Sequence, residues 1–442
     1  MNKNVKVLVI SHNPFSAKQN NGKTLTSFFM GWEKENIRQI FLTMDEYDTT
    51  VCENFYRISD IEVLKSMFKK NKNVGTIINC DNKNVHFNEK KKYDKNFFYQ
   101  FIKKMFQKKI PIFWLMRSIA WKFVKPWKSE KLIKWINEFN PDVIFFQTSS
   151  FSVIYDMVIY LKKITQAKLI IETTDDYVTN TSSFSIIKKH KDKIMEKKYA
   201  NIVKESEYIV VIGEDMMEEY KRRFGGKYVI AMNAVKASGR IDEITLNDKF
   251  VFTFAGNLGL NRWKILVDLG KVIDIIQGKY RRKKIVLNIC SLSLPSKHIL
   301  SKFKQIKSIN YLGALNTEQL NKLKEESNVL VHVESFDKKN IGVTRLSIST
   351  KIPEYMLSNR CILAIGPDTV SSIKYIKKYN IGCVLSNKNS KTWMDDLINL
   401  IDDNDARNKY IKNARTIGNR NHNYFENQKK VQEIICSCVS KK

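Results

Sequence analysis

The stretch with the clearest chemical potential is "FVFTFAGNLGLNRWKIL", from Phe250 to Leu266. An apolar run ends in the loop Gly256-Asn257-Leu258-Gly259, after which apolar residues recur at helical spacing from Trp263. Glycines there let backbone N–H groups approach a ligand, and the start of a helix favours an anion. The stretch therefore predicts a phosphate or diphosphate site, to which Arg262 and Lys264 add cations. An ordinary tight turn is the alternative, because Arg262 stands where the dinucleotide-binding fingerprint has its third glycine.

A second stretch, "STKIPEYMLSNRCILAIGP", supplies groups that suit the other half of such a site. Ser349, Thr350 and Lys351 bring two hydroxyls and a cation directly before an expected helix, and Glu354 falls in its first turn. A carboxylate at this position could accept two hydroxyls of a ribose. The alternative is that Glu354 only stabilises the helix dipole.

The loop after the first apolar run, "SHNPFSAKQNNGKTL", ends in Gly22-Lys23-Thr24. A phosphate-binding P-loop needs a glycine five positions earlier, where this chain has Ala17. The other interpretation is the first strand-to-helix loop of a different doubly wound domain, in which ligands lie beyond the carboxyl ends of the strands.

Apolar runs typical of buried strands alternate with amphipathic segments along the whole chain, which predicts parallel sheets with crossover helices. One series lies before about residue 236 and a second begins at Phe250, with the polar stretch "KASGRIDEITLND" between them. We therefore predict an α/β chain of two doubly wound domains, residues 1–240 and 241–405, and a helical tail over 406–442.

The composition restricts the classes of protein that fit. No window has the roughly 18 to 20 apolar residues of a membrane span, and no signal peptide is recognisable at the N-terminus. Seven cysteines without paired zinc spacing suit reduced thiols, and a cytoplasmic location is expected. The net charge of +31 suggests nucleic acid, an anionic membrane or a phosphorylated substrate as partner, unless the Lys-, Asn- and Ile-rich composition reflects an AT-biased coding sequence.

One segment, from Tyr93 to Trp135, is dense in both lysine and aromatic residues. Such a mixture is typical of a helix that lies in the headgroup layer of an anionic membrane, with Trp114, Trp121 and Trp127 as the contacting side chains. The alternative is a helical insertion whose aromatic residues pack on the N-terminal domain. Nucleic-acid binding is not expected, because no reader motif lies nearby.

The motifs together resemble those of GT-B-fold glycosyltransferases, the group 1 kind of bacterial surface-polysaccharide synthesis. The resemblance rests on "FAGNLGLNRWKIL" and "STKIPEYMLSNRCILAIGP", with "ISHNPFSAKQNNGKTL", "PDVIFFQ", "ETTDDY" and "VVIGEDMMEEYKRRFGGKYVIAMNAV" in the expected order. It implies two Rossmann-like domains that face a central cleft, with the nucleotide sugar bound by the C-terminal domain.

The resemblance also implies a role for each motif. The acceptor side would be lined by His12, Asn13, Gly22 and Lys23, so that the first loop is no P-loop. The donor diphosphate and ribose would be held by Gly256, Asn257, Gly259, Arg262, Lys264, Ser349, Thr350, Lys351 and Glu354. Asp175 and Asp176 would activate the acceptor or contact the sugar, although an aspartate after a strand also commonly caps the next helix.

The implied activity is transfer of a sugar from a nucleotide-diphosphate sugar to a glycan or lipid-linked acceptor, without metal or cofactor. One position departs from the pattern: Leu346 replaces the first of two glutamates eight residues apart, and Glu334 lies too far upstream to fill its place. The departure leaves retention or inversion of the anomeric configuration open. The alternatives are an inactive GT-B partner subunit, a nucleotide-sugar epimerase, a phosphorylase and a basic nucleic-acid-binding protein.

Overall fold

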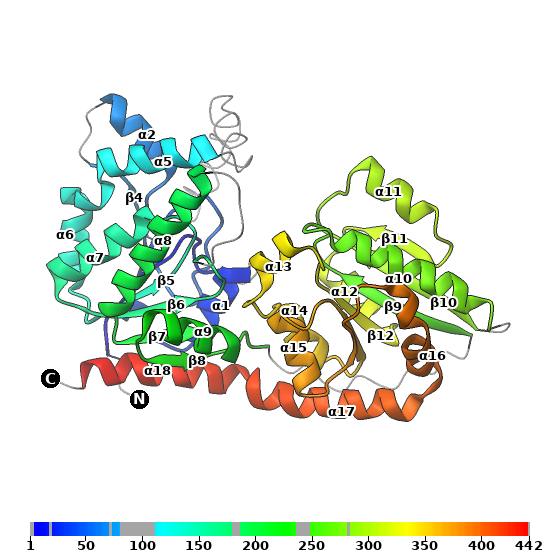
Figure 1. The fold of residues 1–442 in the computed structure, drawn as a ribbon. Helices are drawn as coiled ribbons and strands as arrows, with labels where there is room; N and C mark the ends of the chain where they lie inside the picture. Colours follow the sequence, from blue (N-terminus) through cyan, green and yellow to red (C-terminus); the bar gives the residue numbers. More distant parts are fainter. Residues whose placement is uncertain are drawn as a thin grey trace. The chain divides into compact units, whose positions relative to one another are not determined.

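The computed structural model describes residues 4–16, 20–69, 73–79, 111–178, 186–235, 248–280 and 283–440. They form two compact units (Figure 1). Unit 1 comprises Met1–Ala231 and Phe425–Lys442, and unit 2 comprises Met232–Tyr424. The boundary that the sequence predicts, between residues 240 and 241, lies outside the described residues.

Unit 1 contains an eight-stranded sheet in the order β4-β3-β2-β1-β5-β6-β7-β8. Its pairings are parallel, except that β4 at one edge runs antiparallel to β3. The strands are β1 (Val7–Ile10), β2 (Ile37–Phe41), β3 (Asn54–Arg57), β4 (Thr76–Asn79), β5 (Val143–Gln147), β6 (Lys168–Thr173), β7 (Tyr208–Val211) and β8 (Tyr228–Ile230). The strand order reverses between β1 and β5, so the loops after these two strands flank the position where doubly wound sheets bind ligands.

The described helices of unit 1 cover both faces of this sheet (Figure 1). They are α1 (Asn20–Phe29), η1 (Lys34–Asn36), α2 (Asp60–Lys69), α5 (Pro111–Val124), η3 (Pro126–Lys128), α6 (Glu130–Phe139), α7 (Val153–Thr165), α8 (Ile186–Lys204), α9 (Glu214–Phe224) and α18 (Tyr424–Val439). The last of these comes from the end of the chain. Its Val431, Ile435 and Cys438 are buried in the same core as Phe28.

Unit 2 contains a six-stranded sheet, β11-β10-β9-β12-β13-β14, in which every pairing is parallel. The strands are β9 (Lys249–Ala255), β10 (Lys284–Cys290), β11 (Ile309–Gly313), β12 (Val329–Val333), β13 (Cys361–Ile365) and β14 (Cys383–Leu385). The strand order reverses between β9 and β12, which places the loops after these strands at the second switch point.

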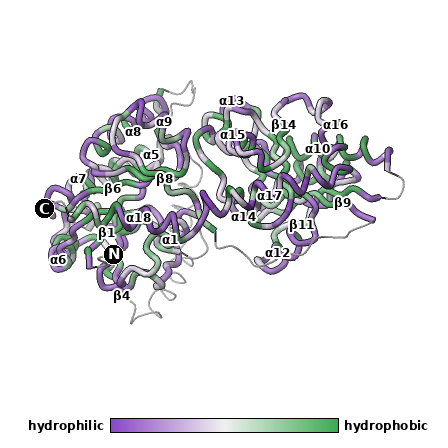
Figure 2. Tube along the Cα trace, turned by 90° about the horizontal axis from the view of Figure 1, so that it is seen from below, coloured by the Kyte–Doolittle hydropathy of each residue, from purple (hydrophilic) through white to green (hydrophobic). Residues whose placement is uncertain are grey.

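The helices of unit 2 include two that follow the predicted donor motifs directly. They are α10 (Arg262–Gln277), α11 (Lys297–Lys304), α12 (Thr317–Glu325), α13 (Lys338–Thr344), α14 (Lys351–Met356), α15 (Ser371–Lys378), η4 (Ser390–Trp393), α16 (Met394–Asp402) and α17 (Asn404–Asn421). The outer helix α12 is mostly hydrophilic, whereas hydrophobic residues gather on the strands (Figure 2).

The expected fold class, α/β with two doubly wound parallel sheets, is confirmed. Central strands such as β5 and β13 are buried along their whole length, as expected for strands covered on both faces. The sequence analysis missed β2, β3, β8 and β14, which are short or interrupted by polar residues. It assigned residues 406–442 to one helical tail; in the structure α17 belongs to unit 2 and nearly all of α18 to unit 1.

Candidate functional site

The first predicted donor motif lies at the switch point of the unit 2 sheet. Strands β9 and β12 pair side by side, so the loop that follows β9 comes next to the residues that follow β12. Arg262, the first residue of α10, donates from Nε to the carbonyl oxygen of Val333 at 3.1 Å. Its Nη2 donates to both carboxylate oxygens of Glu334, at 3.1 and 3.0 Å.

Glu334 is 3% exposed and carries a paired charge at the end of β12. Burial acts to raise the pKa of Glu334, but its interactions with His332 and Arg262 outweigh it and hold the pKa below its usual range. His332 Nε2 lies 3.3 Å from Glu334 Oε1. Glu334 therefore fixes the Arg262 guanidinium at the switch point, a role that the sequence analysis did not assign.

The second predicted motif reaches the same neighbourhood from α14. Burial lowers the pKa of Lys351; Glu354 raises it, and the positive charges of Lys324 and Arg262 lower it further. Lys324 Nζ lies 4.0 Å from Glu354 Oε2. Arg262 and Lys351, one from each predicted motif, thus lie close enough for their charges to interact, and Lys324 is a further cation there that the sequence analysis missed.

The glycine loop itself is internally hydrogen-bonded. The N–H of Gly256 donates to the carbonyl of Cys290 at 3.0 Å, and the N–H of Gly259 donates to Asn257 Oδ1 at 2.7 Å. A Cβ at position 256 would lie 2.8 Å from the ring of Phe254, which explains the glycine there by close packing. Before the Gly259 N–H can bind a phosphate, the Asn257 side chain has to turn away from it.

The remaining predicted donor residues lie near the starts of α10 and α14. Lys264 is exposed, and its charge helps to lower the pKa of Asp337, whose main stabilising contact is the hydrogen bond from Asn261 at 2.6 Å. The Ser349 hydroxyl accepts from the N–H of Lys351 at 3.4 Å, so it is used at the start of α14, and Thr350 is half-buried beside it.

Leu346 occupies the place where the resembled family has a glutamate, and it is 3% exposed. An apolar side chain buried to this extent cannot take over the hydrogen bonds of a carboxylate to a sugar.

In unit 1, His12 and Asn13 directly follow β1 at the switch point. Burial, and next the charge of Arg117, lower the pKa of His12 to about 4, with Asp60 and Asp45 acting in the opposite direction. The imidazole is therefore neutral near pH 7, and its Nδ1 is buried without a hydrogen-bond partner. Asn13 Nδ2 donates to Asp45 at 3.3 Å.

Gly22 and Lys23 lie within α1. A Cβ at Gly22 would lie 2.6 Å from the carbonyl oxygen of Pro14, so the glycine lets α1 pack closely against the preceding loop. Lys23 is exposed.

The two aspartates after β6 differ in their surroundings. Asp176 Oδ1 accepts from the hydroxyl of Tyr220 at 2.7 Å and from the N–H of Val178 at 3.3 Å, so it holds its own loop in place. Asp175 is exposed and accepts from the hydroxyl of Tyr177 at 3.3 Å. Of the two, Asp175 has the more exposed side chain.

A third acidic residue, Glu172, lies at the end of β6 and was not singled out from the sequence. It is fully buried, and burial raises its pKa to about 8. A hydrogen bond from Gln147 Nε2 at 3.0 Å acts in the opposite direction but is outweighed. Glu172 Oε1 has no partner. Glu172 is thus neutral near pH 7; its only sequence signal is an acidic residue inside the apolar run "LIIETT".

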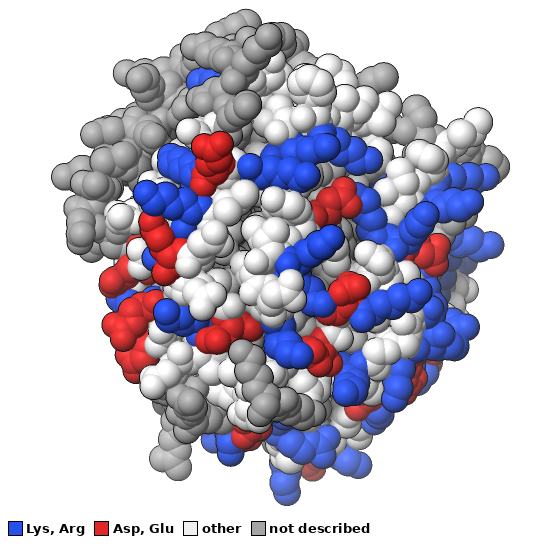
Figure 3. Space-filling model, turned by 90° about the vertical axis from the view of Figure 1, so that its left-hand side faces the viewer, with Lys and Arg blue, Asp and Glu red and all other residues white. Residues whose placement is uncertain are grey.

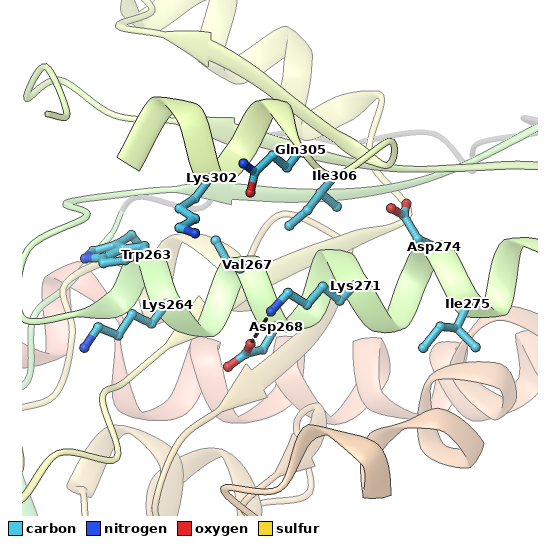
Figure 4. A pocket seen from close by; sticks show the side chains of 10 residues that line it. All are labelled: Trp263, Lys264, Val267, Asp268, Lys271, Asp274, Ile275, Lys302, Gln305 and Ile306. Carbon is cyan, nitrogen blue, oxygen red and sulfur yellow. Dashed lines mark ion pairs between the residues drawn. The ribbon is translucent and has the colours of Figure 1, made fainter. Parts of the chain in front are cut away.

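A groove of about 750 Å³ lies elsewhere in unit 2, between α10 and the end of α11 (Figure 4). Lys302 and Val267 point into the space between the helices, and Asp268 pairs with Lys271 on the α10 side. The groove lies on outer helices and shares only Lys264 with the predicted donor residues, so we do not assign the donor to it. In the described part of the chain, no three His, Cys, Asp or Glu side chains are grouped as metal ligands.

No protein-family model matches the chain, and no curated protein matches it in sequence. Solved structures do match. HepE from Anabaena in complex with UDP has a TM-score of 0.63 at 10% identity, over 98% of this chain and 100% of that one. Sucrose-phosphate synthase from Thermosynechococcus elongatus has 0.62 at 10%, over 99% and 100%. A glycosyltransferase from Rickettsia africae has 0.59 at 12%, over 99% and 100%.

These neighbours share the GT-B fold with the chain over nearly its full length, which confirms at the level of the fold the resemblance seen in the motifs.

Proposed function

We propose that this GT-B chain is a glycosyltransferase that moves a sugar from a nucleotide-diphosphate sugar to a glycan or lipid-linked acceptor in cell-surface polysaccharide synthesis. The observation that carries the proposal is the grouping of charges from the two motifs in unit 2: Glu334 holds Arg262, and the charges of Arg262 and Glu354 both act on Lys351. HepE, which has the same fold, binds UDP, UDP-glucose, and UDP with glucose. A lipid-linked acceptor would place the enzyme at the inner face of a membrane.

The geometry suits stabilisation of a leaving diphosphate. Negative charge grows on that group as the bond to the anomeric carbon breaks, and cations already fixed in place stabilise the transition state more than the ground state. Arg262 is fixed by Glu334 and Val333, and Lys351 is half-buried in the same neighbourhood. Glu354 would accept the ribose hydroxyls. We propose that these cations take the place of a metal ion.

The acceptor would lie on unit 1, beyond β1 and β6. Asp175 is exposed there and can accept a proton from a hydroxyl, whereas the neutral imidazole of His12, whose burial disfavours protonation, can accept a hydrogen bond. The anomeric outcome is not part of the proposal, because Leu346 leaves the sugar position without its usual carboxylate.

Nucleotide binding is the first test. We expect one of UDP, GDP, CMP or ADP to raise the melting temperature of the protein, because a ligand at 100 times its Kd stabilises the fold by about 2.7 kcal/mol. Lys351→Ala and Glu354→Ala should abolish the shift. Lys302→Ala, which removes a cation from the groove of Figure 4, is the matched control and should leave the shift unchanged. A shift that persists in Glu354→Ala and Lys351→Ala, or no shift with any nucleotide, would contradict the proposal.

The buried Leu346 favours one second candidate, an inactive GT-B subunit that binds nucleotide without turning it over. Release of free nucleotide from its sugar conjugate, measured with a mixed pool of lipid and glycan acceptors, separates the two. Turnover excludes the inactive subunit, whereas a thermal shift without any turnover supports it.

A further inference from the structure

Helix α5 has two faces of opposite character. Ser118, Ala120 and Trp121 are buried at 5%, 3% and 1% exposure. The opposite side consists of large apolar side chains that are exposed: Leu115 at 40%, Met116 at 55%, Ile119 at 53% and Phe123 at 74%. These four recur at the spacing of a single helix face, so they form one apolar surface, which we call the α5 outer face.

The inner face of α5 reaches the polar residues next to His12. Arg117 Nε and Trp121 Nε1 both donate to Asp60 Oδ1, at 2.8 and 2.7 Å. The charges of Arg117 and Asp60 both act on the pKa of His12. The same helix therefore borders the predicted acceptor loop on one side and exposes its apolar surface on the other.

Cationic and apolar groups surround the α5 outer face. Lys122 and Lys125 are exposed on or just after the same helix. The start of α8 lies alongside, because Lys191 Nζ is 5.2 Å from the centre of the Trp114 ring, and it adds Ile186 at 82% exposure. Exposed lysines beside a large apolar surface are typical of a helix that lies at the boundary between lipid headgroups and acyl chains.

Two of the three tryptophans that the sequence analysis assigned to membrane contact do not form this surface. Trp121 and Trp127 are 1% and 5% exposed, so they belong to the core of unit 1, as the alternative of a packed insertion predicted for them. On the face in Figure 3, lysines and arginines are interspersed with acidic side chains and form no continuous basic stripe. Charge alone would attract this face to a membrane without fixing its orientation.

We propose that the α5 outer face docks on an anionic lipid bilayer. The net charge of +31 supplies the long-range attraction, and the four apolar side chains supply the contact that fixes which face meets the lipid. A helix of 14 residues is too short to span a bilayer, so α5 would lie in its plane. Docking would bring a lipid-linked acceptor next to His12, and this purpose rests on the proposed function. The docking itself is inferred from the α5 outer face and the net charge alone.

Co-sedimentation with vesicles tests the surface directly, without any nucleotide. We expect the protein to pellet with vesicles of equal parts phosphatidylglycerol and phosphatidylcholine, and to pellet far less with phosphatidylcholine alone. Ile119→Asp combined with Phe123→Ser should weaken binding about tenfold or more, because it places a charge in the contact and removes the most exposed aromatic ring. Ile275→Asp, at a similarly exposed isoleucine on a helix of unit 2, is the matched control and should bind like the parent protein.

Two further results would overturn the proposal. Equal binding of the double variant and the parent would place the contact elsewhere. A change from dimer to monomer in the double variant, seen by sedimentation velocity without lipid, would assign the surface to a second copy of the chain.

Lys122→Gln with Lys125→Gln should weaken binding to the anionic vesicles and reduce its dependence on salt, and no change would show that these lysines do not contact the lipid. The thermal shift with nucleotide, measured on the same variants, should be unchanged. Loss of vesicle binding with an intact shift separates this inference from the proposed function.

Discussion

The switch points of the two sheets are chemically opposite. In unit 2 the charged groups are paired: Arg262 with Glu334, and Lys324 with Glu354. In unit 1 the buried groups are neutral, because His12 has lost its proton and Glu172 has kept its own near pH 7. Fixed cations suit a diphosphate that gains charge, whereas neutral polar groups suit an uncharged hydroxyl. The same architecture thus provides two different electrostatic environments.

The largest effect on this comparison is expected from Glu172→Gln. The pKa of the folded carboxyl is about 8 against 4.5 for an ordinary glutamate, so between these pH values folding takes up a proton and stability falls as the pH rises. Each pH unit corresponds to about 1.4 kcal/mol, so roughly 3 to 4 kcal/mol is lost from pH 5 to pH 8. Glutamine, which stays neutral, should remove this loss, as measured by urea unfolding at several pH values.

Glu207→Gln at an exposed ion pair of unit 1 is the control for that series, and we expect it to keep the slope of the parent protein. If Glu172→Gln also kept the slope, Glu172 would be ionised in the folded protein and the contrast between the two switch points would be lost.

Glu334→Ala tests the charged side of the comparison. Removal of one partner from a buried ion pair leaves the other charge uncompensated, and we expect a loss of about 3 kcal/mol in the free energy of unfolding. Nucleotide binding should weaken as well, because Arg262 loses its anchor. Glu219→Ala breaks surface ion pairs with Arg222 and Arg223 and should cost about 0.5 kcal/mol. Equal costs for the two variants would refute a special role for Glu334.

Tyr220→Phe separates the two aspartates of unit 1. It deletes the hydrogen bond to Asp176 and should cost about 1 to 2 kcal/mol of stability. We expect sugar transfer to fall less than in Asp175→Asn, where stability should be nearly unchanged. Steady-state kinetics and thermal melting of both variants provide the measurement. A larger loss of transfer in Tyr220→Phe would shift the catalytic assignment toward Asp176.

The smallest effect on stability is expected from Lys264→Ala. The side chain is exposed, so the free energy of unfolding should change by no more than about 0.5 kcal/mol. Nucleotide affinity should nevertheless fall, and it should depend less steeply on salt than in the parent protein. Titration calorimetry at two salt concentrations measures this. An unchanged affinity would restrict the donor cations to Arg262, Lys324 and Lys351.

Local patterns predicted the architecture and both donor motifs, because buried parallel strands are continuous apolar runs and glycine loops precede helices. They could not predict that Glu334 pairs with Arg262. The two residues are 72 positions apart, and they meet only because β12 returns to the edge of β9. Local patterns could not predict the burial of Trp121 and Trp127 either, since a lysine- and aromatic-rich helix has the same composition whichever face it buries.

The packing of α18 had no local signal either, and it has a consequence for how the chain is made. Gln432 Nε2 donates to the carbonyls of Phe28 and Met30, and Val431, Ile435 and Cys438 complete the core around them. During translation, unit 2 emerges from the ribosome in full before these residues do. Unit 1 starts first but is completed only after unit 2, so until α18 has emerged its apolar core near Phe28 is open and exposed to chaperones or aggregation.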